Sequence, residues 1–222
     1  ALYNHTDELR LNVPAAYRSN SLGIGVASNL ECMSTEIGIP GKGKAQVGLL
    51  PWACHNLWLI YRHKMDDNVL RDQLFPLLKG AINYYLHFLE KGEDGKLHLP
   101  ATYSPEYDIV EDCNFDLALL RWGCQTLLES TKRLNLQEPL IETWQNVLDN
   151  LVSYPMDENG LLIGKDMPYA FSHRHYSHLL AIYPLYLLNT GQPGAVDTIE
   201  KSLAFWQSKP KALQGYSCTG AS

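Results

Sequence analysis

The chain has 222 residues, of which 45% are hydrophobic, so it is long enough to bury a core and is not composed like a disordered protein. Its 18 basic and 24 acidic residues give a net charge of −6, which argues against nucleic acid or an anionic membrane as the main partner. No apolar run approaches the roughly 20 residues that cross a bilayer, and the first residues lack the pattern of a signal peptide. Neutral small molecules fit better as partners.

Residues 1–46 are irregular, because glycines interrupt every pattern before it reaches the length of a helix. We expect them to be a loop-rich N-terminal part of the same domain whose helical part is residues 47–222. The chain begins with Ala1 and stops at Ser222 within a glycine-punctuated stretch, so we also expect a piece of a longer protein, truncated at its C-terminus.

Helical periodicity begins at Val47, with Pro51 suited to a first turn, and lasts to a turn at 66–68. Steps of three or four then predict a long helix that ends near Glu90, with Pro76 starting or kinking it. The stripe of that helix consists of Leu70, Leu74, Leu77, Ala81, Tyr85 and Phe88. Residues 91–95 predict a turn, and 96–111 are too rich in proline and serine to continue as helix.

The remaining segments predict four more helices. Asp112 or Asn114 can cap the first, which extends to Leu134. The others are expected at 140–151, from the histidines at 173–178 through 188, and at 196–206, with a turn and short strand at 159–164 before the histidines. About six helices joined by turns and loops indicate an all-α fold of helical hairpins. A toroid and a bundle both remain possible.

Five cysteines stand at 32, 54, 113, 124 and 218, an odd number without any Cys-x-x-Cys pair. This pattern predicts neither a disulfide framework nor a cysteine zinc site. Cys54 and Cys124 fall within apolar helical patterns, which predicts that both are small buried hydrophobic residues.

Glu106 is the main candidate for a catalytic acid. It lies in Tyr103-Ser104-Pro105-Glu106-Tyr107, where two aromatic rings flank a carboxyl group on a proline-stiffened loop. Burial there would raise the pKa of the carboxyl group toward that of a general acid. The alternative is a solvated loop glutamate without a catalytic role.

The heptapeptide His173-Arg174-His175-Tyr176-Ser177-His178-Leu179 gathers three imidazoles and a guanidinium. They can donate hydrogen bonds to sugar hydroxyls, pack as a structural cluster, or hold a metal such as zinc. The last requires an extended chain through His175, because helical positions two apart point roughly 200° apart. Among the five tryptophans, we expect Trp122, Trp144 and Trp206 in the core and Trp52 at a pocket.

The order of these motifs resembles glycoside hydrolase family 95, which contains α-L-fucosidases and α-L-galactosidases. The resemblance is carried by Pro51-Trp52-Ala53-Cys54-His55-Asn56-Leu57-Trp58, Ser104-Pro105-Glu106 and the histidine heptapeptide before Tyr183-Pro184. It covers about residues 47–190. It implies an (α/α)6 barrel, of which this chain has only part, and inverting hydrolysis of an oligosaccharide or glycan without a cofactor. It also implies a periplasmic or extracellular location.

Carried over by position, Glu106 matches the general acid of that family, His173 and His175 match sugar-binding histidines, and Trp52 matches a pocket tryptophan. Leu11-Asn12-Val13 is similar to an Asn-x-Asn segment whose asparagines position the attacking water, so Asn12 is a catalytic candidate. Arg10 stands where the first asparagine is expected. Tyr216 stands where a carboxylate partner is expected, which leaves the general base open.

The candidates for a second carboxylate are Glu111, Asp112, Asp116 and Asp166. Asp112 and Asp116 also suit structural roles at a helix start. Two alternatives to a hydrolase remain: a non-catalytic sugar-binding or structural piece of such an enzyme, and a polysaccharide lyase that uses Tyr216 and His175. The sequence predicts no oligomeric state.

Overall fold

The computed structural model describes residues 48–172, 175–213 and 217. These residues form two compact units. Of the described residues, the first unit comprises 48–98 together with Leu120–Leu151, and the second comprises Leu99–Leu119 together with those from Val152 onward. The proposed loop-rich segment 1–46 lies outside the described residues.

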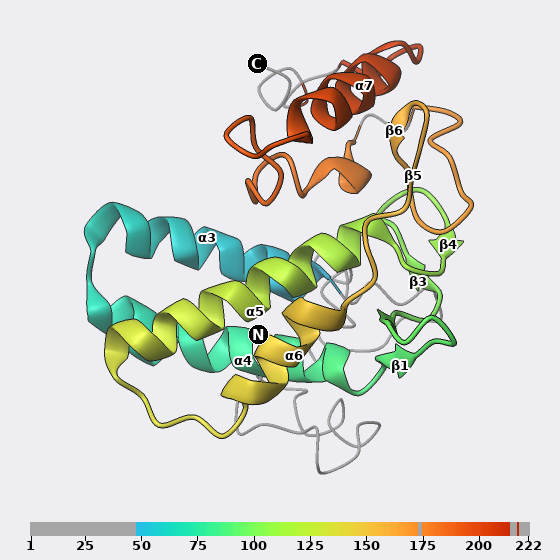
Figure 1. Ribbon diagram of the computed structural model, residues 1–222. Coiled ribbons are helices and arrows are strands. Elements are labelled where there is room, and N and C mark those ends of the chain that lie inside the picture. The colour runs from blue at the N-terminus through green and yellow to red at the C-terminus, as the bar shows by residue number, and fades with distance from the viewer. Residues whose placement is uncertain (1–47, 173–174, 214–216, 218–222) are drawn as a thin grey trace, which may run out of the picture. The chain divides into compact units, whose positions relative to one another are not determined.

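The first unit is mainly helical (Figure 1). Its elements are α3 (Leu49–Lys64), a π-helical turn η3 (Val69–Leu74), α4 (Phe75–Leu86), residues 120–134 of α5 (Asn114–Leu134), α6 (Ile141–Asn150), and the hairpin of β1 (Glu90–Lys91) and β2 (Leu97–His98). Pro76 stands in the first turn of α4, but the backbone before it is also helical, because η3 continues directly into α4. Pro76 therefore lies within a continuous helical segment that is π-helical just before the proline, and not at a free helix start.

The core of the first unit consists of the apolar stripes that the sequence predicts. Trp144 is fully buried and packs edge-to-face on Phe75, with ring centroids 6.3 Å apart. Trp122 is 5% exposed and contacts the ring of His55 in the same edge-on manner, at 5.2 Å. The expected core positions of Trp122 and Trp144 are confirmed. Burial of such rings is the main source of stability for helices of this length.

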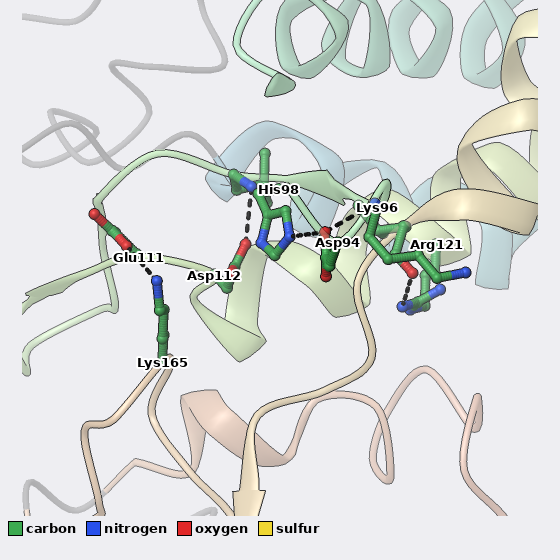
Figure 2. Close-up of polar contacts among 9 residues, drawn as sticks. Asp94, Lys96, His98, Glu111, Asp112, Arg121 and Lys165 are labelled. Atoms are coloured by element: carbon green, nitrogen blue, oxygen red, sulfur yellow. Dashed lines mark hydrogen bonds and ion pairs between the residues drawn. The ribbon is translucent and has the colours of Figure 1, made fainter. Parts of the chain in front are cut away.

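Polar contacts in the first unit include those of its β-hairpin and of Arg121 in α5. In the turn between β1 and β2, the carboxylate of Asp94 accepts a hydrogen bond from the Lys96 N–H at 2.9 Å and lies 3.1 Å from His98 Nε2 (Figure 2). The Lys96 N–H, followed by the His98 side chain, lowers the pKa of Asp94. Arg121 donates to the backbone oxygen of Leu151 at 3.2 Å.

The second unit contains a larger share of hairpins and turns (Figure 1). They are the hairpin of β3 (Thr102–Tyr103) and β4 (Ile109–Val110), residues 114–119 of α5, the hairpin of β5 (Met156–Asp157) and β6 (Gly160–Leu161), the 3-10 turn η4 (Ser177–Leu179), and α7 (Ala195–Gln207). Both hairpins are antiparallel, with Thr102 opposite Val110 and Met156 opposite Leu161. The prediction of α7 is confirmed.

One expectation for the second unit is wrong, and another segment has more structure than expected. Residues 96–111 do not continue as helix, as predicted, but they contain the short strands β2, β3 and β4. The helix expected from the histidines through 188 is only the short η4, followed by turns. Pro184 lacks a backbone donor and disfavours helical backbone at Tyr183, so the apolar spacing of this segment does not become a helix.

The core of the second unit combines apolar and polar groups. Trp206 of α7 is 1% exposed and packs edge-to-face on Tyr176, which confirms its expected core position. Ser202 of α7 accepts a hydrogen bond from the Leu161 N–H at 2.9 Å. Asn114 donates its side-chain amide to the backbone oxygens of Pro155 and Leu162, at 2.9 and 2.7 Å. Side-chain hydrogen bonds thus connect segments that are distant in the sequence.

The buried cysteines behave as small hydrophobic residues. Cys54 and Cys124 are 0% exposed and free, as predicted from their apolar surroundings. Burial raises the pKa of both thiols. Among the helices that the structure describes, none is long and apolar enough to cross a membrane.

Candidate functional site

The β3–β4 turn presents Glu106. The Tyr107 N–H donates to Ser104 O at 3.0 Å, with Pro105 and Glu106 as the two central residues, and the φ of Glu106 is 57°. Proline followed by a positive φ is the pattern of a type II turn, whose third position normally holds glycine or asparagine. A glutamate held in left-handed backbone is uncommon, and such strain is concentrated at functional sites.

Glu106 is not buried, which corrects the expectation from its aromatic neighbours. Its side chain is 51% exposed, because Tyr107 turns its ring toward residues 168–171 and does not cover the carboxylate. Glu106 Oε2 lies 2.7 Å from Nε2 of His175, whose side chain is 25% exposed. A catalytic carboxyl candidate and an imidazole from the histidine heptapeptide thus meet within one unit.

Two further contacts hold this turn. The hydroxyls of Ser104 and Ser177 share a hydrogen bond at 2.9 Å, and both residues are buried. The Thr102 hydroxyl donates to the carboxylate of Asp116, which is fully buried in the first turn of α5. A hydrogen bond to a buried carboxylate is among the stronger contacts in a protein, so the base of the hairpin is firmly fixed.

Four rings form a column beside the turn. Phe171 stacks on Tyr107 with centroids 4.5 Å apart and planes 9° apart, and Tyr107 stacks on Tyr169 at 5.8 Å and 23°. Tyr169 is fully buried and stacks on His178 at 4.6 Å and 17°. The column extends from Phe171, which is 56% exposed, to the buried His178.

The hydroxyl of Tyr107 fastens this column to the backbone. It donates to Pro168 O at 3.3 Å and accepts from the Ala170 N–H at 2.7 Å. Both ends of the Tyr107 side chain are therefore fixed, the backbone by the turn and the hydroxyl by residues 168–170. The position of Phe171 follows from that of the Glu106 turn.

The candidates for a second carboxylate have structural surroundings. Asp112 Oδ1 accepts from the Leu99 N–H at 2.9 Å (Figure 2), and burial of Asp112 and Asp116 is nearly complete. Burial, followed by the negative charge of Asp116, raises the pKa of the neighbouring Cys113 to about 12. Glu111 is exposed and lies 3.2 Å from Lys165 Nζ, and this contact raises the pKa of Lys165. Asp166 stands at an exposed turn with a φ of 57°.

The other predicted site residues lie in the first unit or outside the described residues. Trp52 lies in α3 of the first unit, where it is partly buried. Asn12, His173 and Tyr216 lie outside the described residues, as does Arg10. Within residues 48–172, 175–213 and 217, no three histidine, cysteine, aspartate or glutamate side chains are grouped as a metal ion requires.

Sequence reasoning missed Phe171, Ser177 and the role of Tyr107. Phe171 belongs to no motif, and Ser177 is part of the histidine heptapeptide but the sequence assigns it no role there, so only the fold shows their partners. The proline of Ser104-Pro105-Glu106 was a usable signal for a turn, and therefore for a hairpin. Chemically, the arrangement offers a carboxyl group at the surface that can exchange a proton with a ligand and with an imidazole.

The family model described as the glycosyl hydrolase family 95 catalytic domain matches residues 32–219. The chain is 24% identical over 187 residues to "Alpha-L-fucosidase 2" of Arabidopsis thaliana, which covers 73% of this chain and 20% of that protein. It is also 28% identical over 118 residues to "Trehalose 6-phosphate phosphorylase" of Lactococcus lactis subsp. lactis (strain IL1403), covering 49% of this chain and 15% of that protein. The chain therefore spans a fifth or less of the length of these two relatives.

Proposed function

Because the chain belongs to the glycosyl hydrolase family 95 catalytic domains, we propose that it is the acid-bearing part of a glycoside hydrolase that removes terminal α-L-fucosyl or related α-L-galactosyl residues from glycans. The observation that carries the proposal is the 2.7 Å contact between Glu106 Oε2 and His175 Nε2. The similarity to an α-L-fucosidase favours the sugar. The full catalytic domain is then an (α/α)6 barrel, and the enzyme acts in the periplasm or outside the cell.

Glu106 is the general acid of this mechanism. Its exposed carboxyl group donates a proton to the oxygen that leaves with the aglycone, and His175 Nε2 holds the carboxyl group toward the substrate and stabilises the carboxylate that forms. An inverting glycosidase needs its base roughly 6.5–9.5 Å from the acid, so that a water fits between base and sugar. We assign Asn12 to positioning that water, and His173, His175 and Trp52 to binding the sugar.

Asp112 and Asp116 are structural residues in this proposal. Both are buried and hold the β2–β3 segment and the β3–β4 hairpin through Leu99 and Thr102. A base must reach a water molecule at the sugar, and the burial of these two carboxylates together with their hydrogen bonds to Leu99 and Thr102 favours the structural role. No cofactor takes part in the acid step, since Glu106 carries the proton that the leaving group takes.

The test compares leaving groups of different basicity. Glu106→Gln is assayed on an α-L-fucosylated oligosaccharide, an aryl α-L-fucoside, the matching α-L-galactoside and α-L-fucosyl fluoride, beside Glu111→Gln as a control on the same hairpin. We expect Glu106→Gln to lower kcat on the oligosaccharide by roughly 10²–10⁴-fold, and far less on the fluoride, because fluoride leaves without protonation. The control keeps its activity.

Other outcomes overturn the proposal in distinct ways. If Glu106→Gln lowered kcat equally on all substrates, Glu106 would not be the general acid. A wild-type protein that binds fucosylated glycans and cleaves none would support a non-catalytic module. An unsaturated product that absorbs in the near ultraviolet, formed from a uronate-containing polysaccharide in a separate assay, would indicate a lyase. Proton NMR of the fluoride reaction reports whether the first product is the β-anomer, as inversion requires.

A further inference from the structure

Phe171 is a large apolar side chain that folding leaves 56% exposed, although other rings of its column are buried. Single exposed apolar residues are ordinary on protein surfaces. Phe171 differs because its ring lies nearly parallel to Tyr107, 4.5 Å away, and through it continues into the buried rings of Tyr169 and His178. The exposed ring of Phe171 is thus supported on one face by the stacked rings of Tyr107, Tyr169 and His178.

The same two segments carry the ring column and the acid pair. Tyr107 follows Glu106 directly, and Phe171 precedes His175 by four residues. Glu106 and His175 are 2.7 Å apart, and the Tyr107 hydroxyl is bonded to Pro168 and Ala170. These contacts all lie within the second unit, so the exposed ring and the acid keep a fixed relation.

A rigid, exposed phenyl ring suits the C–H face of a neutral sugar. Each aromatic side chain can cover a large apolar area, and a ring that is already fixed loses little conformational freedom when a ligand stacks on it. A terminal sugar must be enclosed to be recognised as terminal, whereas the rest of the glycan continues into solvent. An exposed platform in the same unit as the acid therefore suits the aglycone side of the bond.

We infer that Phe171, supported by Tyr107, is a stacking platform for the sugar next to the one removed, a neutral pyranose on the leaving-group side of Glu106. This inference rests on the proposed function, because it places the platform relative to the bond that Glu106 protonates. Phe171 would then contribute to substrate specificity by contacting the sugar that leaves, and not the terminal sugar.

The experiment separates the platform from the acid. Phe171→Ala and Phe171→Trp are assayed for kcat/KM on an α-L-fucosylated oligosaccharide and on α-L-fucosyl fluoride, which has no aglycone sugar. Tyr186→Ala is the control, because Tyr186 is a 63% exposed aromatic residue of the same unit outside the column. Phe171→Ala should lower kcat/KM on the oligosaccharide roughly fivefold and leave kcat/KM on the fluoride unchanged. Phe171→Trp should keep or raise kcat/KM on the oligosaccharide. Tyr186→Ala should change kcat/KM on neither substrate.

Two outcomes overturn the inference: equal losses on both substrates, or no loss on either. Binding of the same oligosaccharide without its fucose is measured by calorimetry, because this readout needs no turnover. If the wild-type protein hydrolyses neither substrate, the proposed function fails. The position on the leaving-group side then fails with it, and stacking of a neutral pyranose on Phe171 stands only if the defucosylated glycan binds the wild type roughly fivefold more tightly than Phe171→Ala. Thermal melting of each variant confirms that it is folded.

Discussion

The first unit is organised by apolar faces of helices, whereas the second is organised by polar contacts between distant segments. In the first, Trp144 and Phe75 meet at a buried helix contact. In the second, Ser104 meets Ser177, Thr102 meets Asp116, and Glu106 meets His175. Apolar burial is tolerant of detail, while hydrogen bonds fix positions to within tenths of an ångström. The unit with polar contacts is the one that can hold a reacting group in place.

Trp144→Ala tests the apolar half of this comparison and should have the largest effect. It removes a fully buried ring, so the free energy of unfolding should fall by roughly 3–5 kcal/mol. Urea denaturation measures this change. Leu59→Ala, at a position that is 51% exposed on α3, is the control and should change stability little. A similar loss for both variants would mean that Trp144 is not at the centre of the first core.

Gly160→Ala tests the close packing of the second unit. The new Cβ would lie 2.7 Å from the backbone nitrogen of Ser202, at a φ of 105° that alanine rarely adopts. We expect a loss of about 2–3 kcal/mol, because α7 must move away from β6. Gly194→Ala shares a positive φ of 77° but meets no atom within 4 Å, so it isolates the backbone strain. Equal losses would show that packing against α7 contributes nothing.

His55 should make the first unit sensitive to acid. Burial lowers the pKa of His55 from 6.5 to about 4. Between these two pH values the imidazole is protonated in the unfolded chain and neutral in the folded chain. The stabilising difference is complete above the unfolded pKa and is lost as pH falls from about 6.5 toward 4. His55→Phe keeps the ring against Trp122 and should remove roughly 3 kcal/mol of this acid-induced loss. Urea midpoints between pH 7 and 4 measure it.

His63, exposed on the same helix, supplies the control. His63→Asn should leave the pH dependence of the urea midpoint as it is in the wild type. If His55→Phe follows the wild-type curve as well, burial of His55 does not cause the acid sensitivity.

Glu111→Gln should have the smallest effect. Glu111 and Lys165 form an ion pair whose side chains are 60% and 55% exposed, and water screens such pairs strongly. The urea midpoint should not change measurably. A clear loss would mean that exposed polar contacts also organise the second unit, and not only the buried ones.

The sequence predicted the helices of the first unit well, because apolar residues at steps of three or four mark the buried side of each helix. It failed at residues 177–188, where the stripe is present but Pro184 prevents a helix. Glu106 and His175 could be singled out from their motifs, and the structure places them in contact. The exposure of Glu106, the Ser104–Ser177 bond and the ring column could not be predicted, since each depends on a contact between residues more than 60 positions apart.

The central claim is that the Glu106 turn and the His175 segment act as one site. A double-mutant cycle on kcat/KM for an α-L-fucosylated oligosaccharide, with Glu106→Gln, His175→Asn and both together, tests it most directly. We predict that each single variant loses activity and that the double variant loses no more than the worse single one. Losses that multiply in the double variant would contradict the claim, because the two residues would then act independently.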